Sequence, residues 1–486
     1  MASGSRHFLV VTFPAQGHIN PSLQLAKQLL RQGARVTFAT SISAARRMSR
    51  LTDGGVSSDE RLCFAPFSDG YDQGFRNGVD SVQDYMSEVR RRGSESLRGL
   101  ITSAAVRGRP FACLVYTLVL PWAADVAREL GLPSTLLWIQ PAIVLDIYHY
   151  YFYGYKDLIV EAGCSADSSI ELPGLPMKLA RRDLPSFLLP LDTYAFVLPT
   201  FKEVLEVLEK ETEPRVLVNT FDTLEPEALK AVGKFRLIGI GPLVPSAFLG
   251  GKDPSDTSFG GDLFQGTKDY KEWLDSQAVG SVIYLSFGTI AVISKRQTEE
   301  IARGLLATGR PFLWVIRPTE NKLYQQQQQQ EGGGEDEVVI NCMEELEKQG
   351  MVVPWCSQLE VLSHQSVGCF LTHCGWNSTL ESVVCGVPVV AFPQWTDQGT
   401  NAKLLEDVWG TGVRVVRRAA EKGPEVVEAG EIRRCLEAVM AERREEVKGN
   451  AMRWKEMAMD AGRAGGSSDR NLKAFIEDVS GGPHYP

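Results

Sequence analysis

Several features that define large classes of protein are missing from this sequence of 486 residues. No apolar run reaches the roughly 18 residues that a membrane-spanning helix needs. The nine cysteines include no Cys-x-x-Cys pair, so neither a paired-ligand zinc site nor a thiol redox motif is indicated. No Gly-x-Ser-x-Gly is present, which excludes the nucleophile turn of the serine hydrolases. These absences leave a globular enzyme or binding protein as the expected class.

An excess of positive charge is also lacking. The net charge is −9, and the isoelectric point is near 5.4. Such a balance argues against nucleic acid or an anionic membrane as a partner. The cysteines are odd in number and scattered along the chain, which is typical of reduced, mostly buried thiols. The segment Met1 to His7 is too short and too polar for a signal peptide. We therefore expect a cytoplasmic protein.

The length is too great for a single core and indicates two domains. The first, expected over residues 1–242, begins with a strand from Phe8 to Phe13 and a helix that ends near Gln32. Asn20 is predicted to cap this helix, with Pro21 at its first position. Residues 243–269 have a linker composition, and strand–helix alternation resumes over residues 270–464. Such alternation predicts parallel α/β sheets with helices on both faces.

His18 is one of only six histidines and lies in the turn after the first strand. Open parallel sheets bind ligands at the carboxyl ends of their strands, so the position of His18 favours a functional role over an ordinary surface histidine. Thr117 follows another predicted strand, Ala112 to Tyr116, and is expected at the same edge of the sheet.

Three other segments of the chain have distinctive compositions. Tyr148 to Tyr155 is rich in aromatic residues at helical spacing, which fits either core packing or the wall of a pocket for a flat ligand. Pro173 to Pro190 is proline-rich and predicts an irregular loop. Lys322 to Glu337 is rich in glutamine and glycine and predicts a disordered surface loop.

The most informative stretch runs from Trp355 to Gln398. Within it a buried strand, Val367 to Leu371, is followed by polar residues and then by a helix expected to begin at Ser378, with Ser378 or Asn377 as its cap. A helix start leaves N–H groups unpaired and is positively polarised, so it is a ready site for an anion. A tryptophan before the strand and Asp397-Gln398 after the next one add a stacking face and a hydroxyl-binding carboxylate. Together these groups indicate a nucleotide-sugar site.

This stretch, with the sequence Phe370-Leu371-Thr372-His373-Cys374-Gly375-Trp376-Asn377-Ser378-Thr379-Leu380-Glu381 at its centre, resembles the donor-binding box of plant UDP-dependent glycosyltransferases of small molecules. The resemblance extends over essentially the whole chain and includes His18 and the turn Ser286-Phe287-Gly288-Thr289. It implies the GT-B fold, in which two Rossmann-like domains face each other across a cleft, with His18 and His373 on opposite walls. It also implies that residues 465–486 return to the first domain.

The resemblance assigns a role to each polar position of the box. Trp355 would stack on uracil, with Cys356 and Gln358 nearby, and Glu381 would accept both ribose hydroxyls. The diphosphate would be held without a metal by His373, Asn377, Ser378 and Thr289, since no Asp-x-Asp pair is present. The sugar hydroxyls would be held by Trp376, Asp397 and Gln398.

The implied reaction is transfer of glucose from UDP-glucose with inversion at the anomeric carbon. His18 would be the general base. The family usually orients this histidine with an aspartate, but this chain has Thr117 there. A hydroxyl cannot neutralise an imidazolium as a carboxylate does. This substitution favours an acceptor that is already ionised, such as an auxin-like carboxylic acid, although phenolic hydroxyls stay open. The subgroup it most resembles includes indole-3-acetate, crocetin and anthocyanin 5-O-glucosyltransferases.

Three alternatives remain at this point. His364, Cys369, His373 and Cys374 cluster in the sequence as zinc ligands would, although their spacing fits no paired-ligand pattern. A protein that binds a UDP-sugar without transferring it would be consistent with Thr117. A transferase that uses another UDP-sugar is the third. We expect a monomer whose partners are UDP-glucose and a small lipophilic acceptor.

Overall fold

The computed structural model describes residues 6–51, 59–76, 79–164, 168–189, 197–250, 253, 256–260, 269–316, 342–417 and 425–479. The glutamine-rich loop predicted at 322–337 lies outside these ranges. The chain divides into two compact units, the first formed by residues 1–181, 187–263 and 458–486 and the second by residues 182–186 and 264–457. The predicted domain boundaries at 242, 270 and 465 stay a prediction. Each unit is described by itself below.

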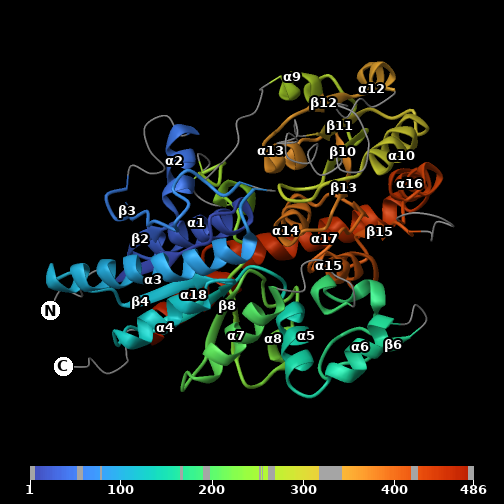
Figure 1. Cartoon of the computed structure of the whole chain (residues 1–486). Coiled ribbons are helices and arrows are strands. Elements are labelled where there is room, and N and C mark those ends of the chain that lie inside the picture. The colour runs from blue at the N-terminus through green and yellow to red at the C-terminus, as the bar shows by residue number, and fades with distance from the viewer. Residues whose placement is uncertain are drawn as a thin grey trace. The chain divides into compact units, whose positions relative to one another are not determined.

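The first unit is built on a seven-stranded sheet in the order β3-β2-β1-β4-β5-β8-β9. Every neighbouring pair in this sheet is parallel. Its strands are β1 (His7–Val11), β2 (Arg35–Ala39), β3 (Leu62–Phe64), β4 (Cys113–Thr117), β5 (Ser134–Trp138), β8 (Arg215–Val218) and β9 (Arg236–Gly239). Apolar runs such as Phe8 to Val11 are fully buried, as expected for strands covered on both faces by helices (Figure 1).

The helices of the first unit connect these strands. They are α1 (Gln16–Arg31), α2 (Ile42–Leu51), α3 (Val82–Val106), α4 (Pro121–Glu129), α5 (Ala142–Phe152), α6 (Lys156–Cys164), α7 (Leu198–Glu209), α8 (Ala228–Ala231) and α18 (Ser467–Asp478). A short antiparallel pair, β6 (Ser169–Ile170) and β7 (Leu179–Ala180), and the 3-10 turn η4 (Ser246–Leu249) belong to the same unit. The 3-10 turns η1 (Arg181–Asp183) and η2 (Ser186–Leu188) lie at the two ends of the segment 182–186, which is part of the second unit. The stretch predicted as one irregular loop at 173–190 therefore contains short ordered elements.

Part of the predicted linker at 243–269 is ordered against α1. The Asp256 carboxylate is mostly buried and forms ion pairs with Lys27 at 2.6 Å and Arg31 at 2.5 Å. The last helix, α18, also packs on this unit, because Asn471 donates to the carbonyl of Gly239 at 2.9 Å. Both segments thus extend the first unit beyond its sheet.

The second unit has a six-stranded sheet in the order β12-β11-β10-β13-β14-β15, again with every pair parallel. Its strands are β10 (Val282–Ser286), β11 (Phe312–Val315), β12 (Met351–Val353), β13 (Val367–Thr372), β14 (Val389–Ala391) and β15 (Gly412–Arg414). Its helical elements are α9 (Tyr270–Asp275), α10 (Lys295–Leu306), α12 (Met343–Gln349), α13 (Gln358–Ser363), α14 (Trp376–Cys385), α15 (Gln398–Lys403), η6 (Leu404–Val408), α16 (Ala429–Glu437), η7 (Ala438–Glu442) and α17 (Arg444–Gly462).

The core of the second unit lies between its sheet and the helices that cover it. Ile283, Leu371 and Val390 from the central strands pack with Ile301 of α10 and Ile432 of α16, and all five are fully buried. The order β10-β13-β14 places the turns after these three strands side by side at one edge of the sheet. That edge holds most of the residues predicted to bind the donor.

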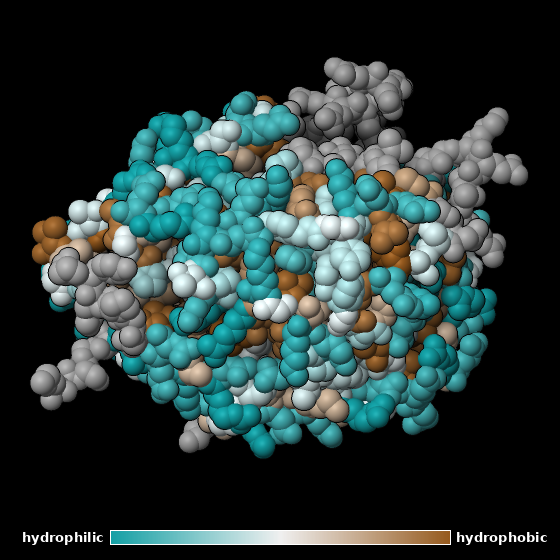
Figure 2. All heavy atoms as spheres, turned by 90° about the horizontal axis from the view of Figure 1, so that it is seen from below, coloured by the Kyte–Doolittle hydropathy of each residue, from teal (hydrophilic) through white to brown (hydrophobic). Residues whose placement is uncertain are grey.

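Among the described residues, no helix is long and apolar enough to span a membrane. The face of the chain shown in Figure 2 is mostly hydrophilic, with hydrophobic residues scattered among the polar ones. Scattered apolar residues of this kind are normal on a protein surface and require no partner. All nine cysteines are free thiols and most are buried, as predicted.

Candidate functional site

His18 lies in the first turn of a helix and not in a loop. The predicted start of this helix at Asn20 is wrong, because α1 begins at Gln16 with Ala15 as its cap residue and Pro21 stands inside it. Proline disfavours a helix interior but does not forbid it when neighbouring contacts compensate. At the next position, the Ser22 hydroxyl donates to the carbonyl of His18 at 2.7 Å. The earlier start fixes His18 on a regular element directly after β1.

The structure brings His18 and Thr117 together at the carboxyl ends of the paired strands β1 and β4. His18 Nδ1 lies 3.2 Å from Thr117 Oγ1, and the same hydroxyl accepts the backbone N–H of Phe13 at 3.3 Å. A Thr117 oxygen that accepts from His18 Nδ1–H would leave Nε2 unprotonated and able to take a proton. Burial lowers the pKa of His18 to about 4, so the imidazole is neutral at pH 7.

In the second unit, the polar turn after β13 leads into α14. The predicted start of this helix at Ser378 is wrong, since α14 begins at Trp376 and its cap residue is Gly375, which makes no side-chain cap bond. Asn377 and Ser378 therefore lie inside the first turn instead of capping it. The helix start is provided by Gly375 and by Cys374, whose φ of +64° is unusual for a residue with a side chain. The first-turn N–H groups of α14 have no partner within the helix and can bind an anion.

His373 sits in a slot between two glycines. A Cβ at Gly288 would lie 2.6 Å from His373 Nε2, and one at Gly375 would lie 2.5 Å from the same atom. Both distances are far below van der Waals contact, so neither position tolerates a side chain while the ring stays in place. The turn after β10, which also carries Thr289, is thus fitted to the turn after β13. The sequence includes both glycines in its motifs but does not reveal this contact.

A hydrogen-bond network links three of the predicted donor ligands. Gln358 Nε2 donates to Ser378 Oγ at 2.9 Å and to Glu381 Oε2 at 2.7 Å. The Tyr284 hydroxyl donates to Gln358 Oε1 at 3.3 Å and lies 3.5 Å from Cys356 Sγ. Tyr284 was not predicted because in the sequence it is indistinguishable from any apolar strand residue.

The two tryptophans of the box differ in exposure. Trp355 lies in the loop between β12 and α13 and is partly exposed, so its ring can receive a base. Trp376 is only 3% exposed, and its ring lies 6.1 Å from that of Trp409. The Trp376 ring is therefore a packing element, and the group that this residue can offer a ligand is its backbone N–H in the first turn of α14.

Asp397 is the cap residue of α15 and Gln398 is its first residue, and both are buried. Gln398 Oε1 accepts the backbone N–H groups of Gln394 at 2.8 Å and Trp395 at 3.1 Å. Both lone pairs of that oxygen are thereby occupied, so Gln398 would meet a sugar hydroxyl as a donor through Nε2.

Asn401 connects this turn with the turn that begins α14. Its Nδ2 donates to Asp397 Oδ2 at 2.7 Å and to the carbonyl of Cys374 at 2.8 Å. Asn401 is fully buried, and no local pattern in the sequence singles it out. The predicted diphosphate-binding and sugar-binding turns are thus held together by one amide.

The aromatic segment predicted at 148–155 is divided between the end of α5 and the residues after it. Tyr148 is buried and stacks on Phe201 with ring centroids 4.3 Å apart. Tyr150 is buried too and donates to the carbonyl of Pro173 at 2.7 Å. For these two residues the structure shows core packing, the first of the two interpretations of this segment.

The proposed zinc ligands are not assembled into a site. His364 interacts with Asp275 at 3.1 Å and with Ser366 at 2.7 Å, while Cys369 is buried within β13. Within the described ranges no group of three or more His, Cys, Asp or Glu side chains could hold a metal ion.

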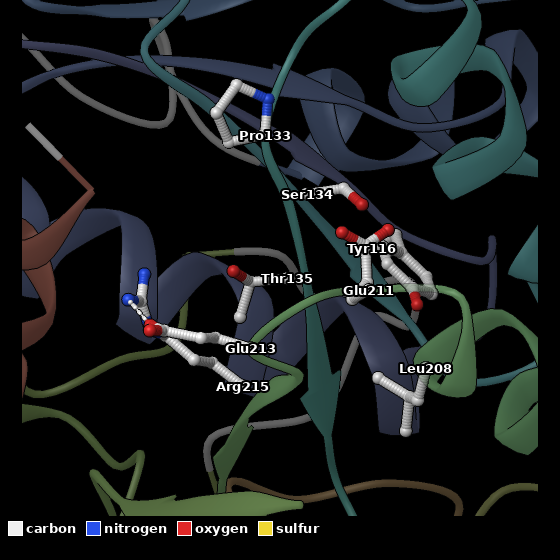
Figure 3. Close-up of a pocket in the computed structure, with 8 residues that line it drawn as sticks. All are labelled: Tyr116, Pro133, Ser134, Thr135, Leu208, Glu211, Glu213 and Arg215. Carbon is white, nitrogen blue, oxygen red and sulfur yellow. Dashed lines mark hydrogen bonds and ion pairs between the residues drawn. The ribbon is translucent and has the colours of Figure 1, made fainter. Parts of the chain in front are cut away.

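A small polar pocket of about 100 Å³ lies at the other edge of the first sheet (Figure 3). Ser134 and Arg215, the first residues of β5 and β8, line it together with Tyr116, Pro133, Thr135, Leu208, Glu211 and Glu213. His18 and Thr117 belong to the carboxyl edge of the sheet, so this pocket is separate from them. Its size suits a few water molecules.

Comparisons with known proteins identify relatives of this chain. Residues 264–461 match the family model described as UDP-glucoronosyl and UDP-glucosyl transferase. A crocetin glucosyltransferase of Gardenia jasminoides, named as chloroplastic, is 59% identical over 98% of both chains. An anthocyanidin 3-O-glucoside 5-O-glucosyltransferase of Verbena hybrida is 53% identical over 98% of this chain and 99% of its own.

Solved structures show the same fold. Os79 from O. sativa, crystallised in complex with UDP, superposes with a TM-score of 0.82 at 34% identity and covers 97% of this chain and 100% of its own. The two parallel-sheet units are therefore the Rossmann-like domains of the GT-B fold, as the sequence predicted. The chain belongs to the plant family 1 UDP-glycosyltransferases, in the subgroup that includes the crocetin and anthocyanin 5-O-glucosyltransferases.

Proposed function

We propose that this enzyme transfers glucose from UDP-glucose to a small lipophilic acceptor, with inversion, and releases a β-glucoside or a β-glucose ester. The observation that supports this most is the construction of the donor site. His373 is wedged between Gly288 and Gly375 at the start of α14, and Asn401 ties that start to Asp397. Such preorganised donors suit a leaving diphosphate, on which charge develops during transfer.

The roles proposed for the donor ligands are those that the resemblance to the family implies. Trp355 stacks on uracil, near Cys356 and Gln358, and Glu381 accepts the ribose hydroxyls. Burial raises the pKa of the Cys356 thiol to about 12, so it stays protonated and acts as a neutral wall. The diphosphate is bound by the side chains of His373, Asn377, Ser378 and Thr289 and by the first-turn N–H groups of α14. The sugar hydroxyls are held by the backbone of Trp376, the Asp397 carboxylate and Gln398 Nε2.

On the acceptor side, His18 Nε2 takes the proton of an attacking hydroxyl while Thr117 orients the ring through Nδ1. The acceptor oxygen forms its bond to the anomeric carbon as the bond to the UDP oxygen breaks. A low pKa and a neutral partner make His18 a weak base, which favours acceptors that are ionised before they bind. We therefore propose carboxylic acids, auxin-like acids among them, as acceptors and hormone conjugation as one use. Relatives named for phloretin and for anthocyanidin glucosides keep phenolic acceptors as candidates.

An acceptor panel with UDP-glucose tests this proposal. Auxins, phenolic acids, flavonoids and terpenoid acids are each incubated with the enzyme, UDP release is measured, and products are treated with alkali, which cleaves esters but not O-glucosides. We expect at least one acid to yield an alkali-labile monoglucoside. Tight UDP-glucose binding without UDP release from any acceptor would instead support a binding protein, and faster transfer from another UDP-sugar would correct the donor.

We further propose that the enzyme is a cytoplasmic monomer. On the face shown in Figure 2, apolar residues are scattered among polar ones, as on the surface of a monomer. Light scattering of the full chain and cell fractionation test these two points, and a dimer or a plastid location would contradict them.

A further inference from the structure

A short segment from the first half of the chain belongs to the second unit. Arg182 to Ser186 groups with residues 264–457, although the residues on either side of the segment belong to the first unit. Asp183 is 1% exposed, and its Oδ1 accepts Arg414 Nη1 at 2.7 Å. The Thr400 hydroxyl donates to the Asp183 carbonyl at 2.6 Å. The segment is thus anchored to β15 and α15 by a buried ion pair and a buried hydrogen bond.

At the other end of the segment, Ser186 is hydrogen-bonded to the turn that carries the proposed sugar ligands. Ser186 N–H donates to the Thr396 carbonyl at 2.8 Å, and Thr396 N–H donates to Ser186 Oγ at 2.8 Å. Thr396 has a φ of +57°, a left-handed conformation that is costly for a β-branched residue. Such a conformation persists only when surrounding contacts enforce it, and the paired bonds from Ser186 do so.

Thr396 in turn contacts the neighbouring carboxylate, that of Asp397. Thr396 Oγ1 donates to Asp397 Oδ1 at 2.7 Å, while Asn401 occupies Oδ2. The approach of the backbones is close, because a Cβ at Gly399 would lie 2.5 Å from the Arg182 carbonyl oxygen. Asp397 is therefore oriented from one side by Asn401 and from the other by Thr396, which Ser186 holds.

We propose that Arg182 to Ser186 is a positioning clamp for the sugar-binding turn, with Ser186 as the residue through which it sets selectivity for the donor sugar. This inference rests on the proposed donor function. Because the clamp acts on the Thr396–Gln398 turn and touches neither Trp355 nor Glu381, it governs how the hexose is held and leaves the affinity for UDP unchanged. A residue that served only to stabilise the fold would have no such selective effect.

The test compares three variants of the full-length enzyme. Ser186→Ala removes the Oγ acceptor and Ser186→Thr keeps it. Ser87→Ala is the matched control and should behave as wild type, since it removes an exposed hydroxyl of α3 that donates to the carbonyl of Gln83 at 2.9 Å. Calorimetry gives the affinity for UDP, UDP-glucose and UDP-galactose, and kinetics give kcat and KM for both UDP-sugars.

For Ser186→Ala we expect the affinity for UDP to be unchanged. Its preference for UDP-glucose over UDP-galactose should fall about 3- to 10-fold, as expected for the loss of one neutral hydrogen bond. In Ser186→Thr this preference should be restored. An unchanged sugar preference, or an equal loss of affinity for UDP itself, would overturn the clamp. Calorimetry keeps the two proposals apart: an enzyme that transfers no glucose would refute the proposed function, whereas the sugar preference in binding still decides on the clamp.

Discussion

At the residue scale, Thr117 supports His18 with a dipole where a carboxylate would supply a charge. The hydroxyl orients Nδ1 at 3.2 Å but offers little stabilisation to the imidazolium that forms when the base takes a proton. The desolvated ring keeps its pKa at about 4. Burial therefore explains why the base is unprotonated at neutral pH, and burial together with the neutral partner explains why it is weak.

The acid limb of the pH–rate profile should report this pKa. A phenolic acceptor has a pKa of about 10 and so does not titrate in acid. With such an acceptor kcat/KM should fall only below about pH 4 to 5, because His18 stays unprotonated above its pKa of about 4. Thr117→Asp should move the limb upward, since a carboxylate favours the charged ring, and raise the rate at pH 7 by about 10-fold. Thr117→Val is the matched control, expected to slow the reaction. A wild-type limb near pH 6.5 would contradict the description of His18.

The two glycines around His373 make a second residue-scale prediction. Gly288→Ala or Gly375→Ala should displace the imidazole, because the new Cβ would lie within 2.6 Å of its Nε2. We expect the KM for UDP-glucose to rise at least about 10-fold, the usual loss when a charge-assisted hydrogen bond to phosphate is removed. Gly430→Ala, at a position with no atom within 4 Å of the new Cβ, is the control and should behave as wild type. Normal UDP-glucose binding in Gly375→Ala would show that His373 does not need its slot.

Residue roles could be predicted from the sequence only where a side chain is chemically distinctive. His18, His373 and Asp397 stand out as polar groups after apolar strands. Tyr284 and Asn401 do not, because their importance lies in hydrogen bonds to residues that are distant in sequence.

At the element scale, strands that are short apolar runs were predictable within a residue or two, as in β4 and β13, whereas the three-residue strands β3 and β12 were not predicted. The helix starts were not predicted correctly. Pro21 suggested that α1 begins at Asn20, but the helix begins earlier, at Gln16. Ser378 and Asn377 suggested a side-chain cap for α14, but its cap residue is Gly375. A glycine cap gives a weaker signal than a serine, since it acts through backbone freedom and not through a side-chain bond.

Two buried carboxyl groups at helix α5 predict that the stability of the protein depends on pH. Asp146 belongs to the helix, and Glu225 binds the backbone at its start. Glu225 accepts the N–H groups of Ala142 and Ile143, both at 3.1 Å, and burial raises its pKa to about 7. Desolvation, followed by the nearby charge of Glu225, raises the pKa of Asp146 well above its ordinary value. Both groups are thus more easily protonated in the folded chain than in the unfolded chain, so both stabilise the fold less as pH rises. For Glu225 the effect is full below about pH 4.5 and is lost as pH rises through about 7.

Thermal unfolding followed at pH 5.5 and pH 8 measures this effect. Between these two pH values Glu225 alone should account for a decrease of about 2 kcal/mol, because its pKa is raised from 4.5 to about 7 and part of the full effect is already lost at pH 5.5. Asp146→Asn should have little effect at pH 5.5 and should reduce the loss at pH 8. Asp157→Asn, on the exposed surface of α6, is the control. An Asp146→Asn variant that is less stable than wild type at both pH values would show that Asp146 is charged in the native state.

At the scale of the whole molecule, strand–helix alternation in the sequence predicted two parallel sheets. It did not predict to which of the two units each segment belongs. Ser186 bonds to Thr396, and Asp183 to Arg414, across more than two hundred positions of sequence. Contacts of this kind depend on the assembled fold, and no local pattern of residues indicates them.

An acidic protein with a net charge of −9 must bind a dianionic donor by local means. We expect the start of α14 and its side chains to do so without a divalent ion, so exhaustive treatment with EDTA should leave kcat and the KM for UDP-glucose unchanged. Activity that is lost with EDTA and restored by Mg²⁺ or Mn²⁺ would contradict this expectation. The same treatment of a known metal-dependent transferase is the control.

The most direct test is the effect of His18→Ala on two acceptors of the same enzyme, one a carboxylic acid and the other a phenol. If His18 removes the proton of the attacking group, kcat/KM for the phenol should fall by at least about 10²-fold, while the acid, which has no proton to lose at pH 7, should be affected far less. Equal losses for the two acceptors, or full activity with the phenol, would contradict the assignment of His18 as the base.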